Sequence, residues 1–413
     1  MKRVVITGAS IISSLADNIP DLWENISNGK HGISDITRFD TSNINTRVAC
    51  EIKDFDAEKY GITIRETKRM DLCTQYGVAA ANMAMEDSNT DFSDIDPFRC
   101  GVIVGTGIGG VETTLNEQLK CIEKTAKRVS PMFIPTMIPN MPSGMIAMKL
   151  GFKGSNFSLA SACATSTHCI GEAFRHIKHG YEDVMVAGGA ENPIIELAVA
   201  GFDNMKALTR STDPDRASIP FDMERSGFVI AEGASVLILE ELEHAKKRGA
   251  HIYAEIVGYG ATDDAYHITS PAVDGSGSAR AMQNAIDEAG ITPKDVDYIN
   301  AHGTSTLIND KVESLAIKLA FGEDLARKVA ISSSKSMIGH MMGAAGSAEA
   351  LICAIALENG MIPPTAGFKI ADPDCDLDYV TNGARKQDIN YAISNSLGFG
   401  GHNATLCFKK YVG

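Results

Sequence analysis

The same series of structural signals occurs twice along this chain, and this repetition constrains the fold more than any other feature of the sequence. Each half contains a strand that ends in a turn, then a strand that leads through a small-residue turn towards a helix, then a strand that ends in a glycine-rich turn. These segments are residues 99–107, 158–165 and 183–190 in the first half, and residues 296–304, 329–340 and 391–401 in the second. The repetition predicts two related α/β units whose reactive turns meet, although any α/β chain shows some of this rhythm.

The length of 413 residues exceeds one ordinary domain and agrees with two units of similar size. Short β-rich runs alternate with helical segments, which predicts buried sheets with helices layered on them. The predicted strands are residues 3–7, 100–104, 156–159, 183–186, 235–239, 253–257, 297–299, 329–332 and 390–394. No low-complexity linker separates the units, so we expect halves 1–250 and 251–413, joined near residues 243–250, to pack as one body.

Charge and cysteine content argue against several classes of function. The net charge of −14 disfavours nucleic-acid binding, since a polyanion is repelled wherever no basic patch intervenes. The nine cysteines are scattered singly, which favours a reducing cytoplasm over a disulfide scaffold or a zinc site. The first residues read as a buried strand and not as a signal peptide, and no run approaches the ~20 apolar residues that span a bilayer. We therefore expect a cytoplasmic protein without membrane insertion.

Cys163 is the best-placed nucleophile in the sequence. It follows an apolar strand and precedes a segment, residues 168–177, that reads as a helix. A thiol on such a turn faces the positive end of the helix, which predicts a lowered pKa, and its small neighbours let a thioester approach backbone N–H groups. The alternative is a buried structural cysteine, which is how we interpret Cys169, Cys353 and Cys407.

Two histidines lie in comparable turns of the second half. His302 directly follows a strand inside a small-residue turn, from which a side chain can project into a cleft. His340 ends a second turn that also contains Lys335, and a small-residue helix suited to close packing follows it. A lone histidine is more often a satisfied polar residue than a catalyst, and Lys335 is either a charge partner of the histidines or a solvated lysine.

The glycine turn at residues 398–401 follows a strand and is suited to supply a backbone N–H to an oxyanion, although a plain hairpin turn is the alternative. Residues 105–110 lack the Gly-Lys-Ser/Thr ending of a phosphate loop, and residues 4–10 lack the dinucleotide fingerprint. The long spacing between the cysteine and the histidines disfavours a zinc site. We therefore expect neither a nucleotide nor a metal.

Four motifs taken together resemble the elongating β-ketoacyl-acyl carrier protein synthases, particularly synthase II. They are Ser161-Ala-Cys-Ala, Ala301-His-Gly-Thr-Ser-Thr, Lys335-Ser-Met-Ile-Gly-His and Asn395-Ser-Leu-Gly-Phe-Gly-Gly-His-Asn, and the likeness runs nearly end to end. The resemblance implies the thiolase fold, with two βαβαβαββ halves in a five-layer αβαβα sandwich, and a homodimer. It also implies a decarboxylative condensation that elongates an acyl chain by two carbons in fatty acid biosynthesis.

The resemblance assigns a role to each motif. Cys163 takes the acyl group, His302 and His340 bind the thioester oxygen of the malonyl group, and Lys335 and Glu313 support the histidines. Two imidazole donors suit this step, because decarboxylation places negative charge on that oxygen. No resident cofactor is implied, since phosphopantetheine arrives on acyl carrier protein. Further implied residues are Phe399 (gate and oxyanion N–H), Ile108 and Phe202 (acyl pocket), Phe133 (towards the partner subunit), and Thr304 and Thr306 (phosphopantetheine arm).

Acyl carrier protein is acidic, so an acidic enzyme needs a local basic surface to bind it. Arg65, Lys68 and Arg69 lie three and four residues apart on a predicted helix, and Lys127, Arg128 and Lys206 add positive charge. The alternative for each of these residues is a solvated surface side chain.

The sequence departs from the family pattern at five positions. Ser10, Ser14 and Ala16 replace the usual Gly, Pro and Gly of the first turn, and Ile338 replaces a common Thr. Ser166 stands where Gly is frequent, close enough to the nucleophile to alter the shape of the pocket.

Three alternatives to a synthase II activity remain. A discrete polyketide ketosynthase shares the Cys-His-His centre, and a non-catalytic subunit like the chain-length factors shares the fold without the nucleophile. A degradative thiolase is disfavoured, because it needs a second cysteine in the glycine turn where His402 and Asn403 stand.

Overall fold

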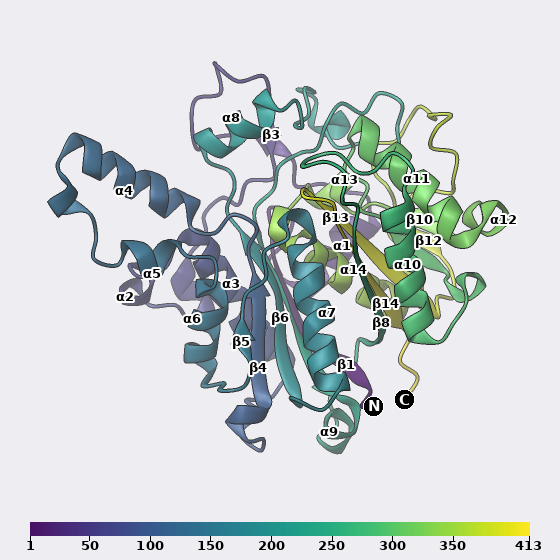
Figure 1. Cartoon of the computed structure of the whole chain (residues 1–413), viewed down its shortest axis with the longest axis horizontal. Coiled ribbons are helices and arrows are strands. Elements are labelled where there is room, and N and C mark those ends of the chain that lie inside the picture. The colour runs from purple at the N-terminus through teal and green to yellow at the C-terminus, as the bar shows by residue number, and fades with distance from the viewer.

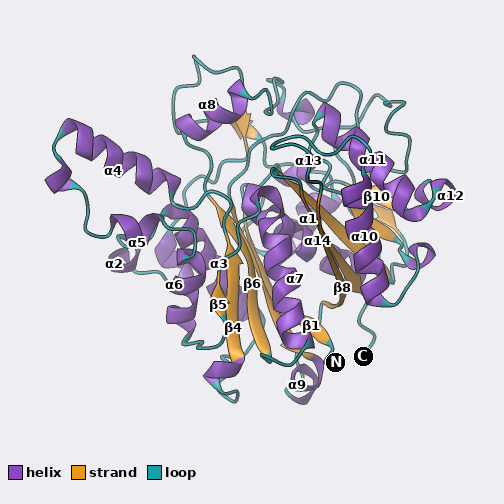
Figure 2. Cartoon of the chain, viewed as in Figure 1, coloured by secondary structure: helices purple, strands orange, loops and turns teal.

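The computed structural model describes all 413 residues, which form one ten-stranded mixed sheet covered by helices (Figures 1 and 2). The strand order is β10-β9-β13-β14-β8-β1-β7-β6-β4-β5. The two inner strands, β1 and β8, pair antiparallel, with Val4 opposite Ile256. Each half contributes one strand of this pair and four strands beyond it. Counted outwards from the pair, the five strands of each half have the same relative order, so the sheet has a pseudo-twofold arrangement.

Each half repeats one series of elements, βαβαβαββ. The first half consists of β1 (Val4–Ile12), α3 (Leu72–Asp87), β4 (Cys100–Gly105), α6 (Met141–Leu150), β5 (Asn156–Phe157), α7 (Thr165–Lys178), β6 (Val184–Glu191) and β7 (Gly233–Glu241). The second consists of β8 (Ala254–Asp263), α10 (Ser276–Ala289), β9 (Tyr298–Asn300), α11 (Leu307–Phe321), β10 (Ala330–Ser332), α14 (Ala345–Asn359), β13 (Tyr391–Gly398) and β14 (His402–Lys409). The pairing is also repeated: β4 is parallel to β5 and β6 as β9 is to β10 and β13, and the remaining neighbours are antiparallel. The predicted internal duplication is confirmed.

The remaining elements are short or lie outside this repeat. They are α1 (Ile19–Ser27), β2 (Ser34–Asp35), β3 (Val48–Ala49), α2 (Ile64–Thr67), α4 (Val111–Glu123), α5 (Phe133–Met137), α8 (Glu196–Asn204), α9 (Leu242–Lys247), α12 (Glu323–Ala326), α13 (Lys335–Ile338), β11 (Met361–Ile362) and β12 (Arg385–Lys386). Short 3₁₀ turns also occur. Two of them directly precede long helices: η4 (Ala162–Ala164) precedes α7, and η7 (Met342–Ala344) precedes α14.

The two halves of the sheet are two β layers, and helices lie between them and on the outer side of each, which gives five layers. Helices α7 and α14 contact each other in the middle and share one large core with the inner sides of both halves. Residues 345–357 of α14 are buried all round, as expected for a helix enclosed between sheets. A second core joins α3 and α6 to the outer side of the first half, and a third joins α10 and α11 to the second. This is the predicted αβαβα sandwich of the thiolase fold.

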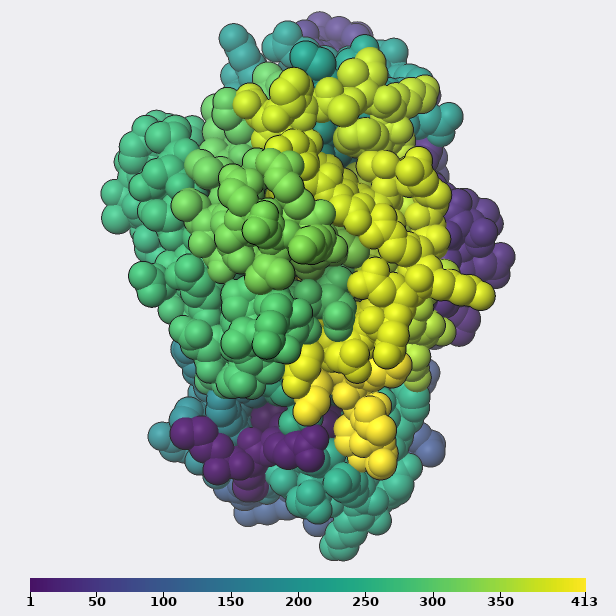
Figure 3. Space-filling view, turned by 90° about the vertical axis from the view of Figure 1, so that its right-hand side faces the viewer, coloured from purple at the N-terminus to yellow at the C-terminus, as the bar shows by residue number.

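Each of the nine predicted strands overlaps one strand of the ten-stranded sheet, but the short strands β2, β3, β11 and β12 were not predicted, and neither was β14 in the main sheet. The polar residues His402, Asn403 and Thr405 interrupt its apolar residues, so the segment reads as part of the glycine turn. Residues 243–250, where we expected the halves to join, contain α9 and the turn that follows it. The first residues and the last residues of the chain lie side by side (Figure 3), where Tyr411 packs against Val5 and Leu242.

The first turn of the chain, where the sequence departs from the family pattern, is held by Ser13. Its hydroxyl accepts the N–H groups of Leu15 and Ala16 at 3.3 and 3.2 Å and donates to the carbonyl of Ala16 at 3.0 Å. Ser10 donates to the carbonyl of Val236 at 3.3 Å inside the sheet. Among the helices, none combines the length and the apolar character needed to cross a bilayer.

Candidate active site

Cys163 lies in η4, directly before α7, and its side chain faces a cavity. The preceding residue, Ala162, has a φ of +50°, a conformation that a non-glycine residue adopts only where the surroundings enforce it. The end of β13 lies against this turn: a Cβ added at Gly398 would be 2.5 Å from the carbonyl oxygen of Ser161 and 3.3 Å from the nitrogen of Cys163. Only glycine permits this approach, which brings the turn after β13 to the nucleophile.

The electrostatic surroundings of Cys163 differ from our expectation. Burial raises the pKa of the Cys163 thiol to about 12, while the nearby positive charge of Lys335 acts in the opposite direction. The expectation of a lowered pKa was wrong, because the helix end was considered without the loss of water around the sulfur. Burial therefore favours the protonated thiol at neutral pH.

His302 follows β9, and a buried carboxylate fixes its backbone. Glu313, on α11, accepts the N–H of His302 at 2.8 Å and the N–H of Gly303 at 2.7 Å. Glu313 therefore holds the turn that carries the histidine and does not contact the imidazole. Burial raises the pKa of the Glu313 carboxyl to about 7.

Lys335 lies beside His302, with 3.3 Å between its Nζ and the Nδ1 of the imidazole. Its charge is paired with Glu349, on α14, and both side chains are buried. Burial raises the pKa of Glu349 to about 7, and the Lys335 charge opposes this. We did not single out Glu349 from the sequence; the signal was a carboxylate in the middle of an otherwise apolar helix, which needs a buried partner.

The two imidazoles are neutral and present the same nitrogen to the cavity. Nδ1 of His302 faces the ammonium of Lys335, and Nδ1 of His340 accepts the N–H of Met342 at 3.3 Å, so each ring carries its proton on Nε2. Their centroids are 5.3 Å apart, with the planes at 85°. Burial, together with the charge of Lys335, lowers the pKa of both rings well below the usual value. The pair can therefore donate two hydrogen bonds without first being protonated.

A cavity of about 320 Å³ brings the predicted reactive residues together. Cys163, His302 and His340 line it, with Phe399 and the threonines Thr304 and Thr306. Lining residues from the first half also include Met205, Lys206 and Phe228. A nucleophile, two hydrogen-bond donors and an apolar wall thus share one cavity where the two halves meet, which is the setting for acyl transfer.

The two predicted pocket residues, Phe202 and Ile108, do not line this cavity, and neither does Phe133, which was predicted to reach towards a partner subunit. The ring of Phe202 is 6.5 Å from that of Phe399 and 5.7 Å from that of Phe228, so it lies behind the wall. Ile108 is 40% exposed, and Phe133, in α5, is half-buried. Ile108 is nevertheless tied to the site, because its N–H donates to the buried carboxylate of Glu191, which also accepts the N–H of Gly343 in η7.

Two residues that depart from the family pattern, Ser166 and Ile338, do not line the cavity. Ser166 is buried, and its hydroxyl accepts the N–H of Ser347 at 2.9 Å, which joins α7 to α14. It does not line the pocket, contrary to our expectation that it could alter the pocket's shape. Ile338 packs in the central core.

The six predicted docking residues are exposed and form no ion pair within the chain. They occupy three separate places: Arg65 lies in α2, with Lys68 and Arg69 just after it; Lys127 and Arg128 follow α4; and Lys206 follows α8. Figure 1 shows α2 and α4 on one side of the molecule and α8 at its upper edge. Only Lys206 lines the mouth of the cavity, so one copy of the chain does not gather all six into one patch.

Comparison with known proteins agrees with this arrangement. The N-terminal domain of β-ketoacyl synthases matches residues 1–245, and the C-terminal domain matches residues 253–369. The chain is 49% identical to 3-oxoacyl-acyl-carrier-protein synthase 2 of Staphylococcus aureus strain N315 over 99% of both chains.

Two solved structures are similar over the full length of both chains. A β-ketoacyl synthase from Burkholderia phymatum superposes with a TM-score of 0.92 at 34% identity. A ketosynthase in complex with its type II PKS acyl-carrier protein superposes with a TM-score of 0.89 at 35% identity. From the matched domains and this full-length similarity, the chain belongs to the β-ketoacyl synthase family of condensing enzymes.

Proposed function

We propose that this chain catalyses the decarboxylative Claisen condensation of malonyl-acyl carrier protein with an acyl group on Cys163, elongating the chain by two carbons in fatty acid biosynthesis. One observation carries the proposal: a buried thiol and two neutral imidazoles with Nε2–H donors line the same cavity. The 49% identity to a 3-oxoacyl-acyl-carrier-protein synthase 2, against 35% for the ketosynthase solved with its type II PKS acyl-carrier protein, favours fatty acid over polyketide synthesis.

In the first step, the Cys163 sulfur attacks the carbonyl carbon of the incoming thioester. The proton of the thiol goes to the departing pantetheine sulfur, and the backbone N–H groups of Cys163 and Phe399 stabilise the oxyanion. Transfer of this proton is required, because the thiol is not ionised at neutral pH.

In the second step, the malonyl carboxylate leaves as carbon dioxide and its electron pair forms an enolate. His302 and His340 donate hydrogen bonds to the thioester oxygen, on which the negative charge develops. The enolate carbon attacks the acyl carbonyl, the carbon–sulfur bond to Cys163 breaks, and the released thiolate takes up a proton. Lys335, paired with Glu349, keeps the imidazoles neutral, and Glu313 holds the His302 turn.

The carrier and the subunit arrangement belong to the same proposal. Acyl carrier protein docks on Arg65, Lys68, Arg69, Lys127, Arg128 and Lys206, and its phosphopantetheine arm passes Thr304 and Thr306. A cytoplasmic homodimer gathers the basic residues from two copies, with Phe133 next to the partner and Ile108 and Phe202 around the acyl pocket. The boundary between halves 1–250 and 251–413 stays a prediction, since β1 and β8 join both halves into one sheet.

The test is to incubate the purified protein with malonyl carrier protein and acyl carrier proteins of increasing chain length. Carbon dioxide release and β-ketoacyl product are measured together. Condensation of saturated medium to long chains supports the proposal. Activity only on a polyketide carrier favours a discrete polyketide ketosynthase, and absence of both outputs from folded protein favours a non-catalytic, chain-length-factor-like subunit.

A further inference from the structure

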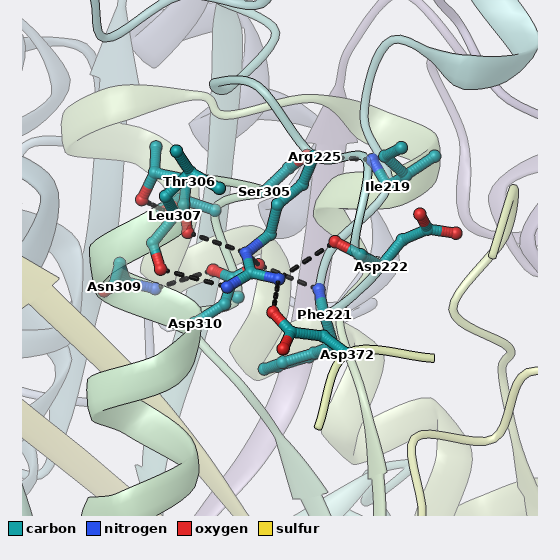
Figure 4. Close-up of polar contacts among 12 residues, drawn as sticks. Ile219, Phe221, Asp222, Arg225, Ser305, Thr306, Leu307, Asn309, Asp310 and Asp372 are labelled. Carbon is teal, nitrogen blue, oxygen red and sulfur yellow. Dashed lines mark hydrogen bonds and ion pairs between the residues drawn. The ribbon is translucent and has the colours of Figure 1, made fainter. Parts of the chain in front are cut away.

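A buried cluster of charged residues lies next to the cavity but does not line it (Figure 4). Its centre is Arg225, which is 4% exposed and lies on the segment between α8 and β7. Two carboxylates face it, Asp372 at 2.6 Å from Nη1 and Asp310 at 3.7 Å from Nε. None of these three residues has a part in the proposed reaction. Burial of an unpaired guanidinium costs folding free energy, so the groups that bind Arg225 indicate which part of the structure it stabilises.

The guanidinium binds the backbone of the turn that carries the two threonines. Nε donates to the carbonyl of Thr306 at 3.1 Å, and Nη2 donates to the carbonyl of Leu307 at 3.0 Å. Nη1 donates to the carbonyl of Asp222 at 2.9 Å as well as to Asp372. Arginine suits this place because its planar fork reaches several acceptors at once, which a lysine ammonium cannot do in the same geometry.

The segment that contains Arg225 also binds the turn at Ser305. Ser305 has a φ of +68°, which a serine keeps only under constraint. Its hydroxyl accepts the N–H of Ile219 at 3.0 Å, and its carbonyl accepts the N–H of Gly227 at 3.0 Å. Residues 219–227 of the first half therefore fix three successive residues of the second half, Ser305, Thr306 and Leu307.

The position of this turn sets two hydroxyl groups at the cavity. The oxygens of Thr304 and Thr306 are 2.9 Å apart and belong to the cavity lining. Thr306 is the N-cap residue directly before α11, but its side chain makes no capping hydrogen bond. Because only one of the two paired hydroxyls donates to the other, the second keeps its O–H for a ligand.

We propose that Arg225, held by Asp372 and Asp310, is a positioning residue that fixes the Thr304 and Thr306 hydroxyls for the pantetheine arm of the substrate. This rests on the proposed function in one respect, the passage of the arm along these threonines. Loosening the arginine displaces the hydroxyls, weakens binding of the arm and leaves the thiol and the imidazoles in place.

The test uses Arg225→Lys and Asp372→Asn, with Asp378→Asn as the matched control. Asp378 lies six residues after Asp372, and its side chain forms a two-bond ion pair with Arg385 and no hydrogen bond with the turn. Acylation of Cys163 by hexanoyl-pantetheine, followed by mass spectrometry, probes the arm without carrier docking and without condensation. Alkylation of Cys163 by iodoacetamide reports whether the nucleophile itself is intact.

For both cluster variants we expect the half-saturating concentration of hexanoyl-pantetheine to rise about 5- to 20-fold, the range expected for partial loss of one or two hydrogen bonds. The maximal acylation rate per intact site and the iodoacetamide rate should stay within about twofold, and the control should match the wild type on all measures. A variant that only lost stability would show fewer reactive sites with unchanged half-saturation, and this result would overturn the proposal.

A double variant, Thr304→Ala with Thr306→Val, separates this proposal from the proposed function. It should raise the half-saturating concentration, and adding Asp372→Asn should then raise it little further, because both changes act on the same contact. Full additivity, or no effect of the threonine changes, overturns the positioning role whatever the outcome for condensation. If Arg225→Lys does not fold, Asp372→Asn decides, since the Asp372 side chain is already 15% exposed.

Discussion

Cys163 and the two histidines serve different steps of the proposed reaction, so substitutions should separate the steps. Cys163→Gln should abolish condensation but keep decarboxylation of malonyl carrier protein, because the imidazole donors remain and the amide resembles the acylated cysteine. His302→Ala or His340→Ala should reduce decarboxylation by about 10²–10³-fold each, as for the loss of one oxyanion donor. Carbon dioxide release is the measurement, and persistent release by the double histidine variant would show that the assigned roles are wrong.

The reactivity of Cys163 should follow access to the cavity and not a lowered pKa. Among the nine cysteines, Cys163 lines the cavity and Cys121, on α4, is partly exposed, while the other seven are buried. In a Cys121→Ser background, iodoacetamide should therefore label Cys163 first, and a bound acyl group should protect it.

The pH dependence of this labelling tests the charge state of the thiol. Since the pKa of Cys163 is raised to about 12, the thiolate fraction and the labelling rate should rise about tenfold per pH unit from pH 7 to 9. Mass spectrometry of quenched samples gives the rate. A plateau below pH 8 would mean that Lys335 and the end of α7 outweigh burial.

Among the elements, the crossing of α7 and α14 sets the geometry of the site, because Cys163 precedes one helix and His340 lies just ahead of the other. The crossing depends on Gly346, where an added Cβ would lie 1.9 Å from Thr167 Oγ1 and 2.9 Å from the Thr167 nitrogen. Backbone cannot give way as a flexible side chain does, so the two helices would have to separate.

We therefore expect Gly346→Ala to destabilise the protein by about 2 kcal/mol or more, as overpacked cores do. Gly201→Ala is the matched control, because Gly201 lies in α8 with open space around it. The control should be stabilised by roughly 0.5–1 kcal/mol through the higher helix propensity of alanine. Chemical denaturation gives both values; equal effects of the two substitutions would contradict the close crossing.

At the scale of the whole molecule, helix α4 projects from the body (Figure 1), and it carries exposed apolar residues. Leu119 is 52% exposed and Ile122 is 70% exposed, and β5 is an edge strand of the sheet. Both features suit an interface with a second copy.

If the proposed homodimer uses this face, Leu119→Glu with Ile122→Glu should shift the protein to a monomer. Burial of two carboxylates without partners opposes association. Light scattering coupled to size-exclusion chromatography measures the mass, and Glu123→Gln, at the end of the same helix, should leave it unchanged. A dimer that survives both glutamates would place the interface elsewhere.

The sequence by itself determined the layered α/β fold, its duplication and the reactive residues of the cavity. Strand, turn and helix signals are local, and reactive residues such as Cys163, His302 and His340 stand in turns whose small neighbours identify them. The motifs that carry the family resemblance are continuous stretches of chain, so they could be read without knowledge of the packing.

The tertiary structure alone decided the charge states and the supporting contacts. The pKa of Cys163 is raised because water is excluded from around the sulfur, which no local pattern reports. Glu349 pairs with Lys335 from fourteen residues away, and Arg225 binds a turn more than eighty residues further along the chain. Such interactions depend on which distant segments the fold brings together and on how much solvent it removes between them, and both are properties of the packed molecule.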